Sequence, residues 1–435
     1  MMGIKLLGYV PKHFCVAFSG WCYRIIMAVT QVISIPIALR CLGVDNYAVF
    51  AVITGLVAWF NLADLGFGYS IQNYISTLRI EGKNTSDFLR SIVLGFLIIA
   101  LVEILFFCIA APFLQVFLLK NFVVKTSWYL LLVIGSAYVI SAVCSVSYRV
   151  FFAEQKGYWG YFYQSAGWLG ALLVMVVLSY LPLGNKLFLI LLGWIVPQTL
   201  CALVSFIHAM PWRGIFTHYN FRLFKEIFAK AGLFNLNAIG AACVLGLDYV
   251  IMSQLLTARD ITLYNIFNKV FQFIHAGYTV VLMALWPVMA EKFATHKAKE
   301  VHAVNVMLLR NIFWAMIYLI GATIFVLLVK DLLLSFFSKN LLTISYGVIV
   351  LFGVYYAVRI WVDSYATAIQ SRNKIKFIAF TVPIQAVVSV SLLYYFGARY
   401  GLEGILIALI LCFVVTAVWV LPCYHYLTLA RENIR

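Results

Sequence analysis

The chain has 435 residues, of which 65% are hydrophobic and 11% are charged. An ordinary soluble domain is roughly half apolar and a quarter charged, so this composition excludes that class. The net charge of +16 would suit a nucleic-acid partner, but in a membrane protein the position of each basic residue matters more than the sum.

Hydrophobic stretches recur along the whole chain, separated by short loops rich in charged residues, Gly, Asn or Pro. A bilayer core about 30 Å thick takes roughly 20 apolar residues per helix. The sequence predicts an all-α polytopic membrane protein of about twelve spans. These lie near residues 14–39, 47–77, 89–112, 127–149, 160–181, 187–208, 231–255, 262–290, 311–330, 344–370, 377–397 and 402–427.

Lys and Arg are unevenly divided between the loops on the two sides. With the N-terminus inside, 20 of them fall on the cytoplasmic side, Arg149 included, and 8 fall outside. Because basic residues concentrate in cytoplasmic loops, both termini are predicted to be cytoplasmic. Topology and contact with anionic lipid headgroups explain the basic inner face, so no nucleic-acid partner is expected. The outer loops are too short for a catalytic domain, and no enzyme activity, metal or other cofactor is predicted.

Two pairs of segments indicate an internal repeat. LGVDNYAVF (42–50) is echoed by LTARDITLY (256–264) at an offset of 214, although Thr257 stands where Gly43 would be repeated. The turns after the fourth and tenth spans match at an offset of 215. Six spans separate the copies, which predicts two parallel six-helix lobes, 1–212 and 231–435.

The segment between the lobes, residues 213–230, is predicted to be a cytoplasmic amphipathic linker. Four apolar side chains fall on one helical face, with basic residues elsewhere: Phe221, Phe224, Ile227 and Phe228. This pattern is typical of a short helix lying in the membrane interface. A solvated basic linker is the alternative.

Three stretches together resemble a known family. They are LGVDNYAVFAVITGLVAWFNLADLGFGYSIQNYIS (42–76), AEQKG (153–157) and LDYVIMSQLLTARDITLYNIFNKV (247–270). The chain resembles the Wzx-type polysaccharide-unit flippases of the multidrug/oligosaccharidyl-lipid/polysaccharide (MOP) exporter superfamily, across nearly its whole length. The resemblance implies that undecaprenyl-pyrophosphate-linked oligosaccharide, O-antigen or similar, crosses the bacterial inner membrane by alternating access. Membrane lipids are implied as further partners, with a polysaccharide polymerase and chain-length proteins as candidates.

A charged side chain at mid-bilayer costs from about 2.5 kcal/mol upward, so each is expected to face protein, water or a partner. Seven such residues are predicted within the spans: Arg24, Asp64, Glu103, Asp248, Lys269, Arg359 and Asp363. The last two are four residues apart on one helix, which predicts a structural ion pair. The other three acids are candidates for ion coupling, with a proton, sodium or no coupling left open.

Arg24 has no acid within one turn of its own helix. Its planar, permanently charged guanidinium suits phosphate oxygens, which makes it a candidate for binding the anionic headgroup. A salt bridge to Asp64 on span two is the alternative.

Two spans carry polar stripes at helical spacing. On span two the stripe comprises Asn61, Asp64, Gly68 and Gln72, and on span eight it comprises Asn265, Asn268, Lys269, Gln272, His275 and Thr279. A polar face in an apolar bundle usually lines a water-filled cavity, and sugar hydroxyls need such side chains. Spans one, two, seven and eight are therefore predicted to line a cavity between the lobes. The stripe residues predicted to bind substrate there are Asn61, Asp64, Gln72, Asn265, Asn268, Lys269, Gln272 and His275. Hydrogen bonding between helices is the alternative.

Other functions remain open at this point. A drug/cation antiporter of the same fold would need acid-dominated cavities, whereas the charges within the spans are four acids and three bases. A major-facilitator transporter would carry a Gly-xxx-Asp-Arg-xx-Gly-Arg pattern after span two, where this chain has RIEGKNTSDFLR. A polysaccharide polymerase or ligase would need a large outer loop. Without a dominant GxxxG stretch, a monomer is assumed.

Overall fold

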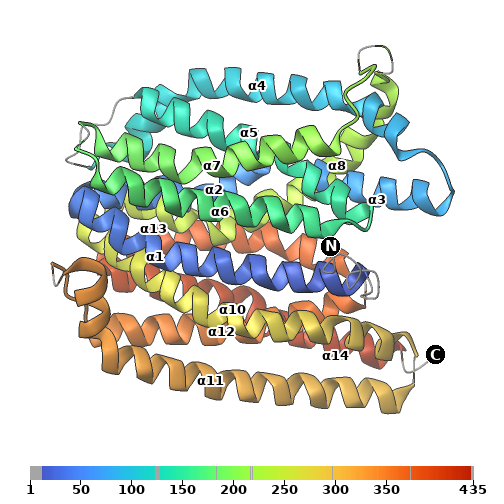
Figure 1. Ribbon diagram of the computed structural model, residues 1–435. Coiled ribbons are helices and arrows are strands. Elements are labelled where there is room, and N and C mark those ends of the chain that lie inside the picture. The colour runs from blue at the N-terminus through green and yellow to red at the C-terminus, as the bar shows by residue number, and fades with distance from the viewer. Residues whose placement is uncertain are drawn as a thin grey trace, which may run out of the picture. The chain divides into compact units, whose positions relative to one another are not determined.

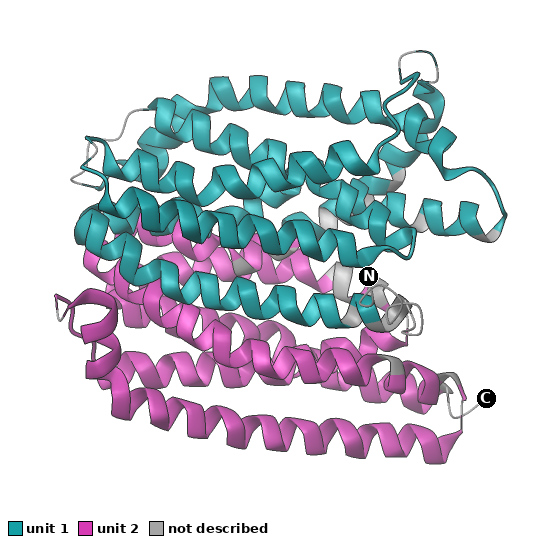
Figure 2. Cartoon of the chain, viewed as in Figure 1, with its two compact units in different colours: residues 1–239 teal, residues 240–435 magenta. Residues whose placement is uncertain are grey.

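The computed structural model describes residues 12–122, 128–182, 184–215, 217, 219–295, 297–339, 341–372 and 374–432. Every regular element in these ranges is a helix (Figure 1). The predicted all-α class is therefore confirmed. The chain divides into two compact units, residues 1–239 and 240–435 (Figure 2), and the division falls within α8 (Phe221–Leu245).

The first unit contains the helices up to the start of α8. They are α1 (Lys12–Gly55), α2 (Val57–Phe60), the 3-10 turn η2 (Asn61–Asp64), α3 (Phe67–Ile80), α4 (Thr85–Leu119), α5 (Trp128–Ala153), α6 (Gly157–Tyr180) and α7 (Lys186–Ala209). Residues 221–230 of the predicted linker form the start of α8, where Phe224 stacks on Phe67 of α3 and Ile227 is 1% exposed. Residues 216 and 218 lie outside the described residues.

The second unit continues from the end of α8. Its elements are α9 (Leu247–Leu255), α10 (Ala258–Ala294), α11 (Ala298–Ser338), α12 (Tyr346–Ser371), α13 (Ile375–Phe413), the π-helical turn η3 (Val414–Val418) and α14 (Val420–Glu432). Thr257 precedes α10, and its side chain caps the helix by accepting a hydrogen bond from the Asp260 N–H. At the equivalent position of the first repeat, Gly43 has a φ of 72° and breaks α1. The next helical segment thus begins after a left-handed glycine in the first repeat and after a capping threonine in the second.

Ten helical segments among the described residues are long and apolar enough to cross a membrane. Two of them, Phe18–Asp64 and Thr381–Arg431, have 47 and 51 residues, more than twice the roughly 20 that one crossing needs. Each contains one glycine in the left-handed region, Gly43 and Gly401. These glycines stand at the predicted boundaries between spans one and two and between spans eleven and twelve. The count of twelve stays a prediction.

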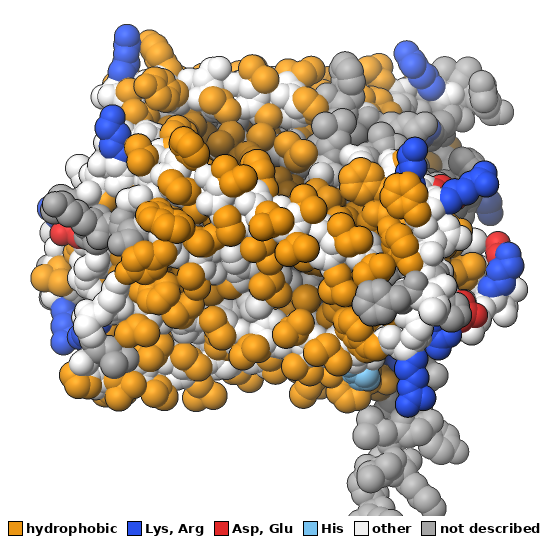
Figure 3. Space-filling view, turned by 90° about the horizontal axis from the view of Figure 1, so that it is seen from above, with side chains coloured by type: hydrophobic (Ala, Val, Ile, Leu, Met, Phe, Trp, Pro, Cys, Tyr) orange, Lys and Arg blue, Asp and Glu red, His pale blue; other side chains and the backbone are white. Residues whose placement is uncertain are grey.

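The surface of the helices suits lipid. In the face drawn in Figure 3, apolar side chains cover the middle and Lys and Arg gather towards the two ends. Large apolar side chains exposed on α4 include Leu97, Leu101, Leu105, Phe106, Ile109 and Phe113. A soluble protein rarely exposes apolar patches of this extent. The protein is therefore a multi-pass membrane protein.

The core of the first unit fixes α3 against α5. Phe67, Ile71 and Ile75 form one face of α3 and pack in the same buried cluster as Val146 and Val150 of α5. Gln72 and Arg149 are the sequence neighbours of Ile71 and Val150, so this packing brings two polar side chains to one place.

Candidate substrate-binding site

Predicted span two is a broken helix. The turn η2 ends at Asp64, α3 begins at Phe67, and the two residues between them, Leu65 and Gly66, have φ values of 48° and 76°. Asp64 Oδ1 accepts a hydrogen bond from the Gly66 N–H at 2.8 Å, which stabilises the break. Broken helices within a membrane occur where they are buried in protein or line a cavity, and transporters bind substrates at such places. The break therefore marks a candidate site.

Arg149 of α5 accompanies Asp64 at this break. The guanidinium acts electrostatically on the Asp64 carboxylate. A Cβ at Gly68 would lie 3.1 Å from Arg149 Cγ and 3.1 Å from Asp64 Oδ2, so only glycine leaves both side chains their present room. Arg149 is not among the residues predicted for the site, because it stands near the end of a span, where its charge fits the cytoplasmic side. The polar stripe of span two, which passes Gly68, was the signal that could have found it.

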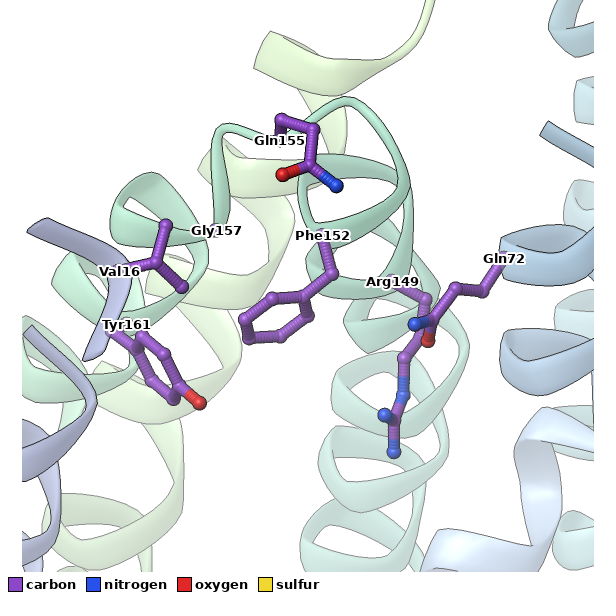
Figure 4. Close-up of a pocket in the computed structure, with 7 residues that line it drawn as sticks. All are labelled: Val16, Gln72, Arg149, Phe152, Gln155, Gly157 and Tyr161. Atoms are coloured by element: carbon purple, nitrogen blue, oxygen red, sulfur yellow. The ribbon is translucent and has the colours of Figure 1, made fainter. Parts of the chain in front are cut away.

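A pocket of about 400 Å³ opens beside Arg149 (Figure 4). Its lining comes from α1, α3, α5, α6 and the α5–α6 turn and comprises Val16, Gln72, Arg149, Phe152, Gln155, Gly157 and Tyr161. In Figure 4 the amide of Gln72 points towards Arg149. Ligand pockets in proteins have volumes of roughly 300–1,000 Å³, so the space suits a small polar group.

The other predicted residues of this unit do not line the pocket. Arg24 is partly buried on α1, and its neighbour Tyr23 stacks on the pocket residue Tyr161 with 5.6 Å between ring centroids. Glu103 is partly buried on α4 and is influenced electrostatically by Asp64. Asn61 is exposed in η2. The structure thus brings Asp64 and Arg149 together, with Gln72 on the same pocket.

In the second unit, polar side chains of predicted spans seven and eight bond to tyrosines. Tyr264 donates to the buried Asp248 carboxylate, and the Asn265 amide donates to Tyr249 Oη at 2.7 Å. Tyr356 of α12 donates to Asn268 Oδ1 at 2.8 Å. These contacts join α9, α10 and α12. For Asn265 and Asn268, which are 2% and 7% exposed, the arrangement is the interhelical bonding that the sequence left as the alternative.

His275 and the pair on α12 form a second cluster in this unit. Arg359 Nη2 lies 3.5 Å from Asp363 Oδ2, and His275 Nε2 of α10 lies 3.3 Å from the same oxygen. Arg359 also donates to Tyr355 Oη at 3.4 Å. The carboxylate of Asp363 is therefore shared between two helices, which ties α10 to α12.

Two members of the span-eight stripe are less buried than the others. Gln272 is exposed and Lys269 is partly buried, whereas Asn265, Asn268 and His275 are buried. The exposed side of α10 continues with the small residues Ala276 and Gly277. Within the predicted stripe, Asn265, Asn268 and His275 are thus buried, and Gln272 is exposed.

Comparison with known proteins identifies the family. No family model matches the chain. A Salmonella typhi protein named for O-antigen transport is 32% identical over 96% of this chain and 96% of its own length. A Yersinia pseudotuberculosis protein named for O-antigen export is 30% identical, with 95% of each chain covered. The chain belongs to the O-antigen transporter family. As a member of this family, it is a transporter and not an enzyme.

Solved structures show the same fold. An inward-facing multidrug resistance MATE transporter of the MOP superfamily has a TM-score of 0.76 and 13% identity, covering 93% of this chain and 99% of that one. The lipid II flippase MurJ in an inward closed conformation has a TM-score of 0.70 and 13% identity, covering 96% and 90%. This O-antigen transporter therefore shares the fold of these two membrane transporters.

Proposed function

We propose that this protein flips undecaprenyl-pyrophosphate-linked oligosaccharide units, O-antigen or a similar polysaccharide, from the cytoplasmic to the periplasmic leaflet by alternating access. One observation carries the proposal, the 32% identity over 96% of the chain to a protein named for O-antigen transport. The fold shared with a protein named as a lipid II flippase supports it.

The described side chains suit a substrate with an anionic end and a hydroxyl-rich end. Arg149 and Arg24 are guanidinium groups, which form strong charge-assisted hydrogen bonds with phosphate oxygens. Gln72, Asn61, Lys269 and Gln272 are partly buried or exposed in the structure and can reach sugar hydroxyls. Asn265 and Asn268 bond to tyrosines instead, so within this proposal they and His275 shape the site more than they contact sugar.

The remaining parts of the proposal concern location and coupling. The 20 to 8 division of basic residues supports an inner-membrane protein with both termini in the cytoplasm. Asp64, Glu103 and Asp248 are the proposed residues for coupling to a proton or sodium gradient, and no cofactor is proposed. A polymerase and chain-length proteins are proposed partners, because a flipped unit must next be polymerised.

The second candidate is a drug/cation antiporter, which the fold shared with a MATE transporter favours. A cation site would be dominated by acids. In the described first unit, however, Arg149 is the charged residue that lines the pocket. The charge of the pocket therefore favours an anionic substrate.

The test is deletion of the gene in its own host, with the wild-type gene returned on a plasmid. We expect loss of polymerised surface polysaccharide, accumulation of lipid-linked units on the cytoplasmic face, and recovery of both on complementation. Arg24→Ala is expected to impair recovery severely and Arg24→Lys partially, at normal protein levels. Unchanged polysaccharide in the deletion strain, together with lost resistance to cationic dyes, would replace the flippase by the antiporter.

A further inference from the structure

The charged side chain that lines the pocket beside Arg149 is that of Arg149 itself, so the lining is positively charged. Of its seven lining residues, Arg149 is charged, none is acidic, and Gln72, Gln155 and Tyr161 are neutral hydrogen-bonding side chains. Glu154 precedes the lining residue Gln155 in the sequence, and its Oε2 lies 2.9 Å from Lys156 Nζ, with which it forms an ion pair. The side chains turned into this space therefore offer one fixed positive charge and several donors, as an anion requires.

The start of α6 adds a second positive contribution. Gly157, the first residue of α6, lines the pocket, and the preceding Lys156 makes no side-chain capping bond. The first N–H groups of a helix carry partial positive charge and bind anions readily. A Cβ at Gly157 would lie 2.5 Å from Phe152 Cδ1, so only glycine lets this terminus approach the pocket wall so closely.

The aromatic wall of the pocket is held in place. The ring of Tyr161 stacks on Tyr23 and meets Phe152 edge-on, with centroids 5.0 Å apart in the second contact. A Cβ at Gly20 would lie 3.0 Å from the Tyr161 ring, so α1 also approaches it closely. A rigid wall lowers the entropy cost of ordering a ligand.

The membrane side of the pocket follows from the proposed topology. The α5–α6 turn, residues 154–156, falls on the cytoplasmic side when both termini are inside, and Gln155 of this turn lines the pocket. A lipid-linked substrate made on the cytoplasmic face would reach this end of the first unit before it reached the parts deeper in the membrane.

We propose that this pocket is a receiving subsite for the diphosphate of the lipid-linked substrate, with Arg149 as the residue that recognises the anion. The inference rests on the proposed function and deepens it. Arg149 forms charge-assisted bonds with diphosphate oxygens, Gln72 and Tyr161 donate from either side, and the α6 terminus faces the same charge. Asp64 holds Arg149 through its charge and restrains it until the stronger anion arrives.

The binding experiment uses the full chain in nanodiscs and radiolabelled geranylgeranyl diphosphate as the probe. We expect saturable binding, displaced by unlabelled probe and by an excess of inorganic diphosphate but not by geranylgeraniol. Arg149→Gln should weaken binding roughly 10- to 100-fold, as for loss of a charged hydrogen bond, and Arg149→Lys should retain part of it. Arg90→Gln is the matched control, because Arg90 pairs with Asp87 on the surface of the same unit and should leave binding unchanged.

Three results would overturn the inference. They are equal binding by Arg149→Gln and wild type, equal displacement of the probe by geranylgeraniol and by inorganic diphosphate, and recovery of binding in the double variant Asp64→Asn, Arg149→Gln. The last would mean that Arg149 only neutralises Asp64. Complementation separates this inference from the proposed function. If wild type fails to restore polysaccharide, the function fails, whereas equal restoration by wild type and Arg149→Gln defeats the pocket alone.

Discussion

The two units use similar polar residues in different ways. In the first, a break at Leu65 and Gly66 leaves Asp64 and Arg149 beside a pocket of about 400 Å³. In the second, Asn265, Asn268 and Asp248 are buried and bonded to tyrosines of α9, α10 and α12. A polar residue within a membrane span can thus line a space or bond to a neighbouring helix.

The largest expected effect is on the shared carboxylate of the second unit. Arg359→Ala leaves Asp363, whose side chain is 27% exposed, without its guanidinium partner. Breaking a buried ion pair on one side typically costs about 3–5 kcal/mol. Because Asp363 is partly exposed and keeps His275 at 3.3 Å, we expect the lower end of this range and a lower unfolding temperature. Thermal unfolding in detergent measures this.

The double variant Arg359→Ala, Asp363→Ala is the control, because it removes both charges together. It should recover most of the lost stability. An Arg359→Ala variant that keeps full stability but loses export would show that this pair contacts substrate, and the contrast between the units would fail.

In both units the sequence predicts the positions of the helices better than the polar contacts between them. Runs of apolar residues report burial in lipid directly, so the spans were readable. The break at Leu65 was not, because leucine gives no signal for a left-handed backbone. Tyr356 lies 88 residues from Asn268, and a partner at such a distance depends on how α10 and α12 pack. Arg149 was missed because its charge stood next to a loop.

An intermediate effect on stability is expected when one amide side chain in each unit is removed, and the two variants should differ. Asn268→Ala removes the acceptor of the buried Tyr356 hydroxyl, which is expected to cost about 1–3 kcal/mol. Gln72→Ala changes a partly buried pocket side chain and should alter stability by less than about 0.5 kcal/mol while reducing export. Unfolding temperature and polysaccharide recovery are measured on the same preparations. Equal loss of stability in both variants would remove the distinction.

The last prediction tests whether the helix break in the first unit serves function. Gly66 has a φ of 76°, and a residue with a Cβ pays roughly 1–2 kcal/mol in this left-handed conformation. Gly66→Ala should therefore destabilise the protein slightly and shift the Asp64 carboxylate that bonds to the Gly66 N–H.

Gly82→Ala is the matched control, since Gly82 has a φ of 67° in the turn before α4 and no atom within 4 Å of its added Cβ. Both variants should lose similar stability, because the backbone cost is the same. Only Gly66→Ala should reduce polysaccharide export at equal protein level, because only this break positions Asp64 and, through it, Arg149. Equal export by the two variants would reduce the break to a structural kink.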